Sequence, residues 1–197
     1  MNDPIEQIER KVFQSFWDDG LIDSLLGFAL TAIGFAWWQD AFIWGIFFPP
    51  ICATLWFPLR KRFVEPRIGY VEFSGTRELK GRSFRMNMIA LLAGTMLLGI
   101  FLFLSGSVPD TDLPRTLVPG LPAFLLALMV LPFAFFTGCK RFFMYSLVLL
   151  AAATSTIYLA LDPGLPILIG GILILVNGLT ILIRFLTTHP IESGTSV

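Results

Sequence analysis

Long apolar stretches, separated by shorter polar ones, set the pattern of this chain. A helix that crosses a bilayer needs about 20 mostly apolar residues, and several of these stretches reach that length. The pattern predicts an all-α polytopic integral membrane protein with about six transmembrane helices. The six predicted spans lie at residues 21–38, 41–59, 86–104, 121–137, 142–161 and 166–183.

One long polar interruption, residues 60–85, divides the spans into a first hairpin, 21–59, and four further helices, 86–183. This basic loop holds eight Lys/Arg against three Glu, in a chain whose formal net charge is zero. With six spans and a short tail at 184–197, 13 of the 14 Lys/Arg fall on one side and only Arg115 falls on the other. Cytoplasmic loops of membrane proteins carry such an excess of Lys and Arg, so the pattern predicts that both termini and the basic loop are cytoplasmic.

Residues 1–20 precede the first span and are predicted to form an amphipathic helix at the membrane surface. Ile5, Ile8 and Val12 recur at helical spacing, and most polar residues of the segment fall on the opposite face. A helix of this kind can lie in the headgroup region. Packing as an ordinary cap on the cytoplasmic loops is an equally open alternative.

Composition excludes an ordinary soluble domain, and the motifs indicate that the chain is not an enzyme. Hydrophobic residues make up 55% and charged residues 14% of the sequence, and the mean hydropathy is +0.77. A soluble domain has about 25% charged residues. The single histidine, His189, lies in the tail, and no phosphate-binding loop or nucleophile motif occurs. Cys52 and Cys139 are interpreted as packing residues, so neither a metal site nor a cofactor is expected.

Two acidic residues at the start of the first span are the main candidates for chemistry within the membrane. Asp19 and Asp23 are four residues apart and share a helix face. Since a charge in a membrane helix is costly, one hypothesis is a cation or proton site at the cytoplasmic end of the span. The alternative is an ion pair with an Arg or Lys of the basic loop. In the last span, Asn177 beside Gly178 is a candidate for a polar path between the fifth and sixth spans, because a buried amide requires several hydrogen-bond partners.

The basic loop is the candidate binding segment outside the membrane. Basic residues near a membrane surface each contribute about 1 kcal/mol to the attraction of anionic lipid. The loop is therefore predicted to bind anionic headgroups of the bilayer, or a membrane or cytoplasmic protein partner; alternatively, its charges serve only to fix the orientation of the chain. Nucleic acid is not an expected partner, because the loop lacks a recognised fold or stacking platform. The candidate residues are Arg60, Lys61, Arg62, Arg67 and Tyr70.

Within this loop, residues 65–73 read EPRIGYVEF. The segment resembles one in bacterial polytopic membrane proteins that carry a P-R-x-G-Y-V stretch after a first helical hairpin, and the resemblance covers about residues 18–73. It implies a bacterial cytoplasmic (inner) membrane and transfers no catalytic role. The partial alternation of apolar residues over 67–73 also predicts a short strand.

Together these features predict a non-enzymatic accessory or scaffold component of the membrane whose basic loop binds lipid or a partner. The alternative is a small transporter or channel for a neutral solute or ion, built from two inverted repeats of three spans. Small residues on the third and fifth predicted spans favour close helix contacts there. Pro49, Pro50 and Pro132 would supply the interrupted helices that a transporter needs.

Overall fold

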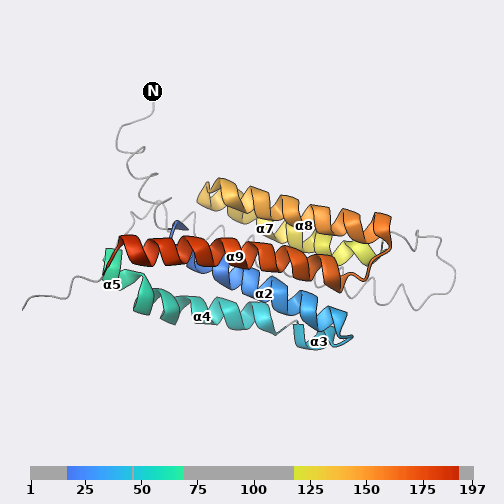
Figure 1. Ribbon diagram of the computed structural model, residues 1–197, viewed down its shortest axis with the longest axis horizontal. Coiled ribbons are helices and arrows are strands. Elements are labelled where there is room, and N and C mark those ends of the chain that lie inside the picture. Colours follow the sequence, from blue (N-terminus) through green and yellow to red (C-terminus); the bar gives the residue numbers. More distant parts are fainter. Residues whose placement is uncertain (1–16, 46, 69–117, 191–197) are drawn as a thin grey trace, which may run out of the picture. The chain divides into compact units, whose positions relative to one another are not determined.

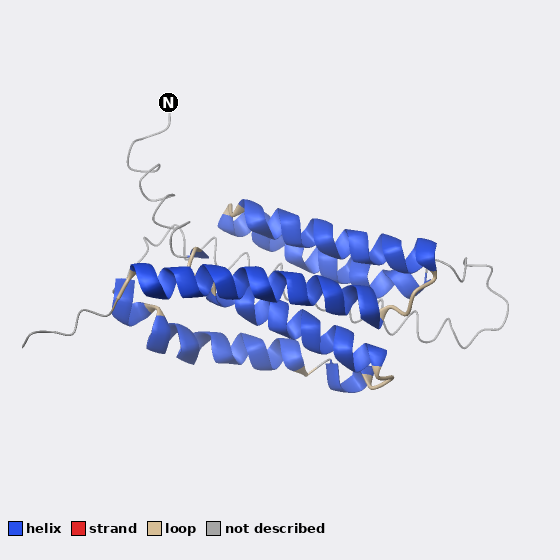
Figure 2. Cartoon of the chain, in the orientation of Figure 1, coloured by secondary structure: helices blue, strands red, loops and turns tan. Residues whose placement is uncertain are grey.

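The computed structural model describes residues 17–45, 47–68 and 118–190, which are helical apart from short turns and loops and contain no strand (Figure 2). This confirms the predicted all-α class for the described part of the chain. Most of the predicted surface helix and the whole predicted span 86–104 lie outside the described residues. Four described stretches are long and apolar enough to cross a membrane, namely Leu21–Trp38, Ile43–Arg67, Lys140–Leu159 and Gly164–Thr188, and a shorter apolar helix covers Leu121–Phe135.

The described helices belong to two units. Figure 1 labels the helices along the chain. The first unit joins the beginning and the end of the chain, whereas the sequence pattern groups the last helix with the three spans before it. Its helices are α2 (Leu21–Trp38), α3 (Phe42–Gly45), α4 (Phe48–Phe63), α5 (Glu65–Ile68) and α9 (Gly164–Thr188). The second unit contains the short 3₁₀ helix η1 (Val118–Gly120), α7 (Leu121–Thr137) and α8 (Lys140–Leu159).

A tight turn joins α2 to the next helical segment, as the short polar separation predicted. Helix α2 has the predicted bounds and ends where the backbone N–H of Gln39 donates to the carbonyl of Phe35. Asp40 takes a left-handed conformation with φ of 55°, which Asp tolerates better than most residues. Its N–H donates to the carbonyl of Trp37 at 2.9 Å, and this reverses the chain.

The predicted second span is described on both sides of residue 46, which itself lies outside the described residues. It consists of α3 and α4, and Pro49 and Pro50 stand in the first turn of α4. Proline is tolerated there because N–H groups at the start of a helix have no acceptor within the helix. The effect of these prolines on the continuity of the span stays a prediction, because residue 46, between α3 and α4, lies outside the described residues. At its other end, α4 continues through the first four residues of the predicted loop to Phe63, past the predicted boundary at Leu59.

Glycines at seven-residue intervals bring α2 and α9 into direct backbone contact. Gly20, Gly27 and Gly34 lie at the start of α2 or within it, and α9 carries a second set of three glycines at the same interval. We call these six residues the glycine seam. Seven-residue spacing keeps one face of a helix against a partner over several turns. Small residues on that face let two helix backbones approach closely in a membrane. The glycines of α9 are Gly164, Gly171 and Gly178.

Each glycine of the seam faces the backbone of the other helix. A methyl group at Gly20 would lie 2.6 Å from the amide nitrogen of Leu182, and one at Gly164 would lie 2.5 Å from that of Trp38. Between these ends, added methyl groups would collide with the backbone of the facing residues. The facing pairs are Ser24 with Gly178, Gly27 with Leu175, Thr31 with Gly171, and Gly34 with Leu168. The contacts run in opposite directions along the two helices, so α2 and α9 are antiparallel neighbours (Figure 1).

In the second unit, α7 and α8 form an antiparallel hairpin with alanines along the contact. Ala123, Ala127 and Ala134 of α7 are fully buried, as is Leu149 of α8. The hydroxyl of Ser146 donates to the carbonyl of Ala127 at 3.1 Å, which ties the two helices together. This hairpin contains the predicted fourth span, and α7 has the predicted bounds of 121–137.

Candidate functional site

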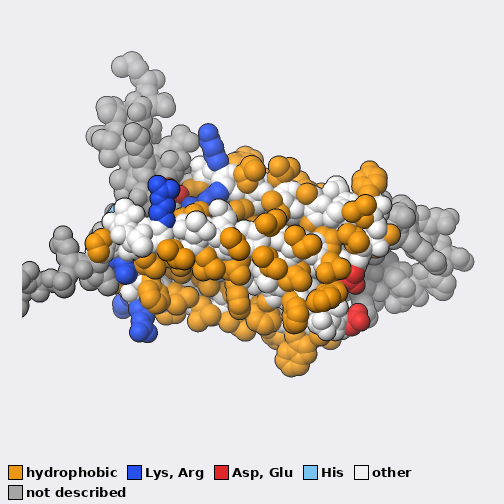
Figure 3. Space-filling view, viewed as in Figure 1, with side chains coloured by type: hydrophobic (Ala, Val, Ile, Leu, Met, Phe, Trp, Pro, Cys, Tyr) orange, Lys and Arg blue, Asp and Glu red, His pale blue; other side chains and the backbone are white. Residues whose placement is uncertain are grey.

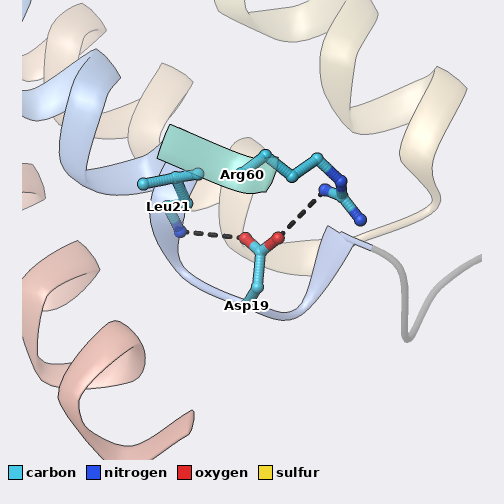
Figure 4. A network of polar contacts seen from close by, with 3 residues as sticks. All are labelled: Asp19, Leu21 and Arg60. Atoms are coloured by element: carbon cyan, nitrogen blue, oxygen red, sulfur yellow. Dashed lines mark hydrogen bonds and ion pairs between the residues drawn. The ribbon is translucent and has the colours of Figure 1, made fainter. Parts of the chain in front are cut away.

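An ion pair joins the start of α2 to the last turn of α4. The Nη1 atom of Arg60 lies 3.0 Å from Oδ2 of Asp19, and the other carboxylate oxygen accepts the backbone N–H of Leu21 at 2.9 Å (Figure 4). The carboxylate therefore serves both the cation and an N–H of the first turn of α2 that has no acceptor within the helix. Only 8% of the Arg60 side chain and 2% of the Asp19 side chain are exposed.

Two stacked tryptophan rings lie next to this ion pair. The indole of Trp17 stacks on that of Trp56, with ring centroids 6.0 Å apart and planes 3° from parallel. The guanidinium carbon of Arg60 lies 5.6 Å from the Trp56 ring centroid, within the range of a cation–π interaction. We call Trp17, Asp19, Trp56 and Arg60 the boundary cluster. Tryptophan favours the interface between membrane and water, so the cluster is suited to mark the end of the α2–α4 pair.

The predicted binding residues of the basic loop separate into two groups. Arg60 is buried in the boundary cluster, whereas Lys61 and Arg62 are exposed. Arg67 is half-buried in α5, and its Nη1 donates to the carbonyl of Phe63. Arg67 also begins the predicted strand at 67–73, which is wrong at this point because α5 is helical through Ile68.

Basic side chains gather at one end of the first unit. Its described residues contain five Lys/Arg: four near the end of α4 or in α5, and Arg184 near the end of α9. The opposite end, where α2 turns and α9 begins, carries Asp40 and Asp162. Figure 3 shows blue basic side chains at the end where α5 lies, red acidic ones at the other end, and orange apolar side chains between them. Helices that cross a membrane with a basic cytoplasmic end carry charges distributed in this way.

Asp23 lies deeper in the first unit than the boundary cluster. It is 0% exposed, and its backbone faces Gly178 across the glycine seam. The two acids of the predicted cation or proton site therefore differ in position: Asp19 pairs with Arg60, and the buried Asp23 lies one turn further along α2, beside the glycine seam. The pairing predicted as the alternative is confirmed for Asp19. Asn177, the candidate for a polar path, is exposed on α9.

The other predicted site residue, Tyr70, lies outside the described residues. Within the described ranges, no group of three or more His, Cys, Asp and Glu residues is placed to hold a metal ion. Cys52 and Cys139 are both buried and unbridged, in keeping with packing roles.

The sequence pattern did not predict two features of this unit. The contact between Trp17 and Trp56 joins residues on either side of the first hairpin, and their separation alone gives no sign of stacking. The glycine seam does leave a signal, because both sets of glycines repeat every seven residues. The close helix contacts expected from small residues involved the third and fifth predicted spans instead. Comparison of the chain with protein-family models, curated proteins and solved structures gives no match.

Proposed function

We propose that this chain is a non-enzymatic, multi-pass membrane protein that binds anionic phospholipid through the basic end of its first unit. In this proposal it acts as an accessory or scaffold component in a bacterial inner membrane. The proposed topology has six spans with both termini in the cytoplasm, and an amphipathic helix at residues 1–20 on the cytoplasmic surface.

The observation that carries the proposal is that neighbouring cations in the last turn of α4 differ in burial and in pairing. Arg60 pairs with the buried Asp19, while Lys61 and Arg62 remain exposed beside it. Arg67 adds a further partly exposed cation in α5. Cations at this position also suit the negative end of the α4 dipole, so they need no protein anion to hold them there. Their exposed surface supports an interaction with phosphate groups at the membrane boundary.

The orientation follows from the same charge distribution. The basic end of the first unit corresponds to the cytoplasmic side under the positive-inside rule, and the acidic end with Asp40 and Asp162 corresponds to the other side. The anionic leaflet facing the cytoplasm would then meet Lys61 and Arg62 directly.

The native tryptophans allow a direct test. In a Trp37→Phe, Trp38→Phe, Trp44→Phe background, Trp17 and Trp56 report on the boundary cluster next to the proposed lipid site. The protein is placed in phosphatidylcholine vesicles, and quenching by brominated phosphatidylglycerol is compared with quenching by brominated phosphatidylcholine. We expect stronger quenching by the anionic lipid, and loss of this preference in Lys61→Gln/Arg62→Gln.

A matched control is Lys140→Gln/Arg141→Gln, which removes the same charge from the second unit. It should leave the preference unchanged. An equal loss of the preference for the anionic lipid in both double variants would mean that any basic residue of the chain attracts this lipid. That result would overturn the proposal. Loss of a co-purifying protein in Lys61→Gln/Arg62→Gln, with no lipid preference in the parent, would identify a protein as the partner instead.

A second candidate function is favoured by the complete burial of Asp23 in a helix long and apolar enough to cross a membrane. Ionisable residues in membrane helices commonly mark ion or proton pathways. In this alternative the protein is a small transporter or channel, and Asp23→Asn abolishes a proton or cation flux in proteoliposomes while Asp18→Asn does not. Equal flux in the parent and both variants would exclude it.

A further inference from the structure

We infer that exposed aromatic rings at the acidic end of the first unit bind the boundary between headgroups and acyl chains in a phospholipid leaflet, and so set the depth of α3 in the membrane. The rings belong to Phe35, Trp38, Trp44 and Phe47, and we call them the aromatic rim. This contact does not depend on anionic lipid, and it lies at the opposite end of the unit from the site in the proposed function.

The rings of the aromatic rim are largely exposed and form two pairs. Their exposed fractions run from 46% for Trp38 to 69% for Trp44. The rings of Phe35 and Trp38 have centroids 6.3 Å apart. Those of Trp44 and Phe47 have centroids 6.4 Å apart. An indole combines a large apolar ring system with one N–H donor, so it favours the boundary of a leaflet over both water and the hydrocarbon core.

Contacts between α3 and α2 place the rim close to one end of the unit. A methyl group at Gly45 would lie 3.2 Å from Cα of Ile33 and 3.3 Å from Cβ of Ala36. Gly45 is therefore level with the last turns of α2, two to five residues before Trp38. At about 1.5 Å per residue, this is about 3–8 Å from the end of α2. Trp44 directly precedes Gly45, so it lies near the same depth.

The turn after α2 marks the water side of this boundary. Gln39 and Asp40 follow Trp38 and are both exposed. Asp162 lies at the same end, because a methyl group at Gly164 would lie 2.9 Å from its Oδ1 atom and 2.5 Å from the backbone nitrogen of Trp38. A carboxylate in the hydrocarbon core is costly, so both acids favour headgroups or water. Figure 3 shows apolar side chains beside acidic ones at the end of the unit where Figure 1 labels α3.

The rings thus lie between charged groups on one side and the apolar length of α2 on the other. The boundary of a phospholipid leaflet has the same order, from headgroups through the ester region to acyl chains. This match in chemistry identifies the lipid leaflet as the partner of the aromatic rim.

Depth-dependent quenching tests the inference with Trp44 as the only tryptophan. The background carries Trp17→Phe, Trp37→Phe, Trp38→Phe and Trp56→Phe. The protein is placed in phosphatidylcholine brominated either near the glycerol end or near the methyl end of one acyl chain. We expect the shallow bromines to quench Trp44 about twice as strongly as the deep ones, because the leaflet boundary adjoins the glycerol end. Trp38 as the only tryptophan should show the same order.

A matched control moves the reporter to the middle of α4. Ile51→Trp with Trp44→Phe in the same background introduces an indole at a position whose native side chain is 48% exposed. This position precedes Arg60 of the boundary cluster by nine residues, or about 14 Å along the helix. The deep bromines should quench this variant more strongly than the shallow ones.

Two results would overturn the inference. Stronger quenching of Trp44 by the deep bromines would place the rim in the hydrocarbon core. Weak quenching of Trp44 by both lipids, with the expected quenching of Ile51→Trp, would mean that water, the second unit or another protein covers the rim. Lys61→Gln/Arg62→Gln should leave the depth dependence of Trp44 unchanged, so this result and the test of the proposed function can fail separately.

Discussion

Arg60 and Asp19 are 41 residues apart in the sequence, yet they form a buried ion pair that closes the α2–α4 hairpin at its basic end. The pair removes one cation from a run of three and leaves the next two exposed. The same short segment thereby provides both an internal contact and a charged surface.

Removing the negative charge of the ion pair should destabilise the first unit. In Asp19→Asn the amide oxygen can still accept the N–H of Leu21, but the Arg60 guanidinium loses its counter-charge. An unpaired buried charge costs about 3 kcal/mol, and the measurement is the free energy of unfolding in mixed micelles titrated with SDS. Asp18→Asn changes the exposed neighbour and should cost less than about 0.5 kcal/mol. Equal effects of the two substitutions would contradict the structural role of the pair.

Adding one methyl group to the glycine seam should also destabilise the protein. In Gly171→Ala the new Cβ meets the backbone of Thr31, which cannot move aside as a side chain can. We expect a loss of about 1–3 kcal/mol, typical of overpacking, measured as a lower midpoint of thermal unfolding in detergent. Val176→Leu adds the same volume on the exposed face of α9 and should leave the midpoint unchanged. Unchanged stability in Gly171→Ala would mean that the two backbones are not in direct contact.

The hairpin of the second unit should depend on one hydroxyl. Ser146→Ala removes the hydrogen bond to the carbonyl of Ala127 and is expected to cost about 0.6 kcal/mol, the average for hydrogen bonds between membrane helices. Thr154→Val removes an exposed hydroxyl that donates to the carbonyl of Ala151 in its own helix and should have a smaller effect. The comparison uses the unfolding free energy in the same micelles. A larger loss for Thr154→Val would contradict the assigned contact.

Membrane sidedness should follow the charges of the first unit. Single cysteines are introduced at Lys61, Arg184, Asp40 and Asp162 in a chain whose two native cysteines are replaced by alanine. A membrane-impermeant maleimide added to intact spheroplasts should label the cysteines at positions 40 and 162. Those at 61 and 184 should react only after the membrane is opened. Labelling of position 61 together with position 40 in intact spheroplasts would disprove the orientation.

The six-span arrangement makes a separate claim about the second unit. A cysteine at Lys140 should be protected in intact spheroplasts like one at position 61, because two further proposed crossings separate the basic loop from the turn before α8. Exposure of position 140 would show an odd number of crossings between the two positions.

Much of the helix pattern could be predicted from the sequence because each membrane helix is an apolar run with polar ends. The predicted bounds of α2 and α7 agree with the structure, and α8 and α9 differ only at their ends. The boundary of α4 was less accurate because Arg60, Lys61 and Arg62 were assigned to a loop. Basic residues are in fact favourable in the last turn of a helix, where they meet the negative end of its dipole.

Tertiary contacts were harder to predict. The acids of the first span were expected to pair with some cation of the basic loop, but the sequence does not distinguish Arg60 from the other seven basic residues. Repeated glycines indicate that a helix has a close neighbour, but they do not show which helix that neighbour is. The neighbour of α2 is the last helix, α9.

The antiparallel glycine seam has a consequence for biosynthesis. The ribosome makes α2 long before α9, and the whole second unit is translated in between. The glycine-lined face of α2 must therefore enter the bilayer without its partner and wait for the end of translation. Assembly of the first unit is thus completed only after α9 has been inserted. A truncated chain that lacks α9 would leave the glycine-lined face of α2 uncovered and open to attack by membrane proteases.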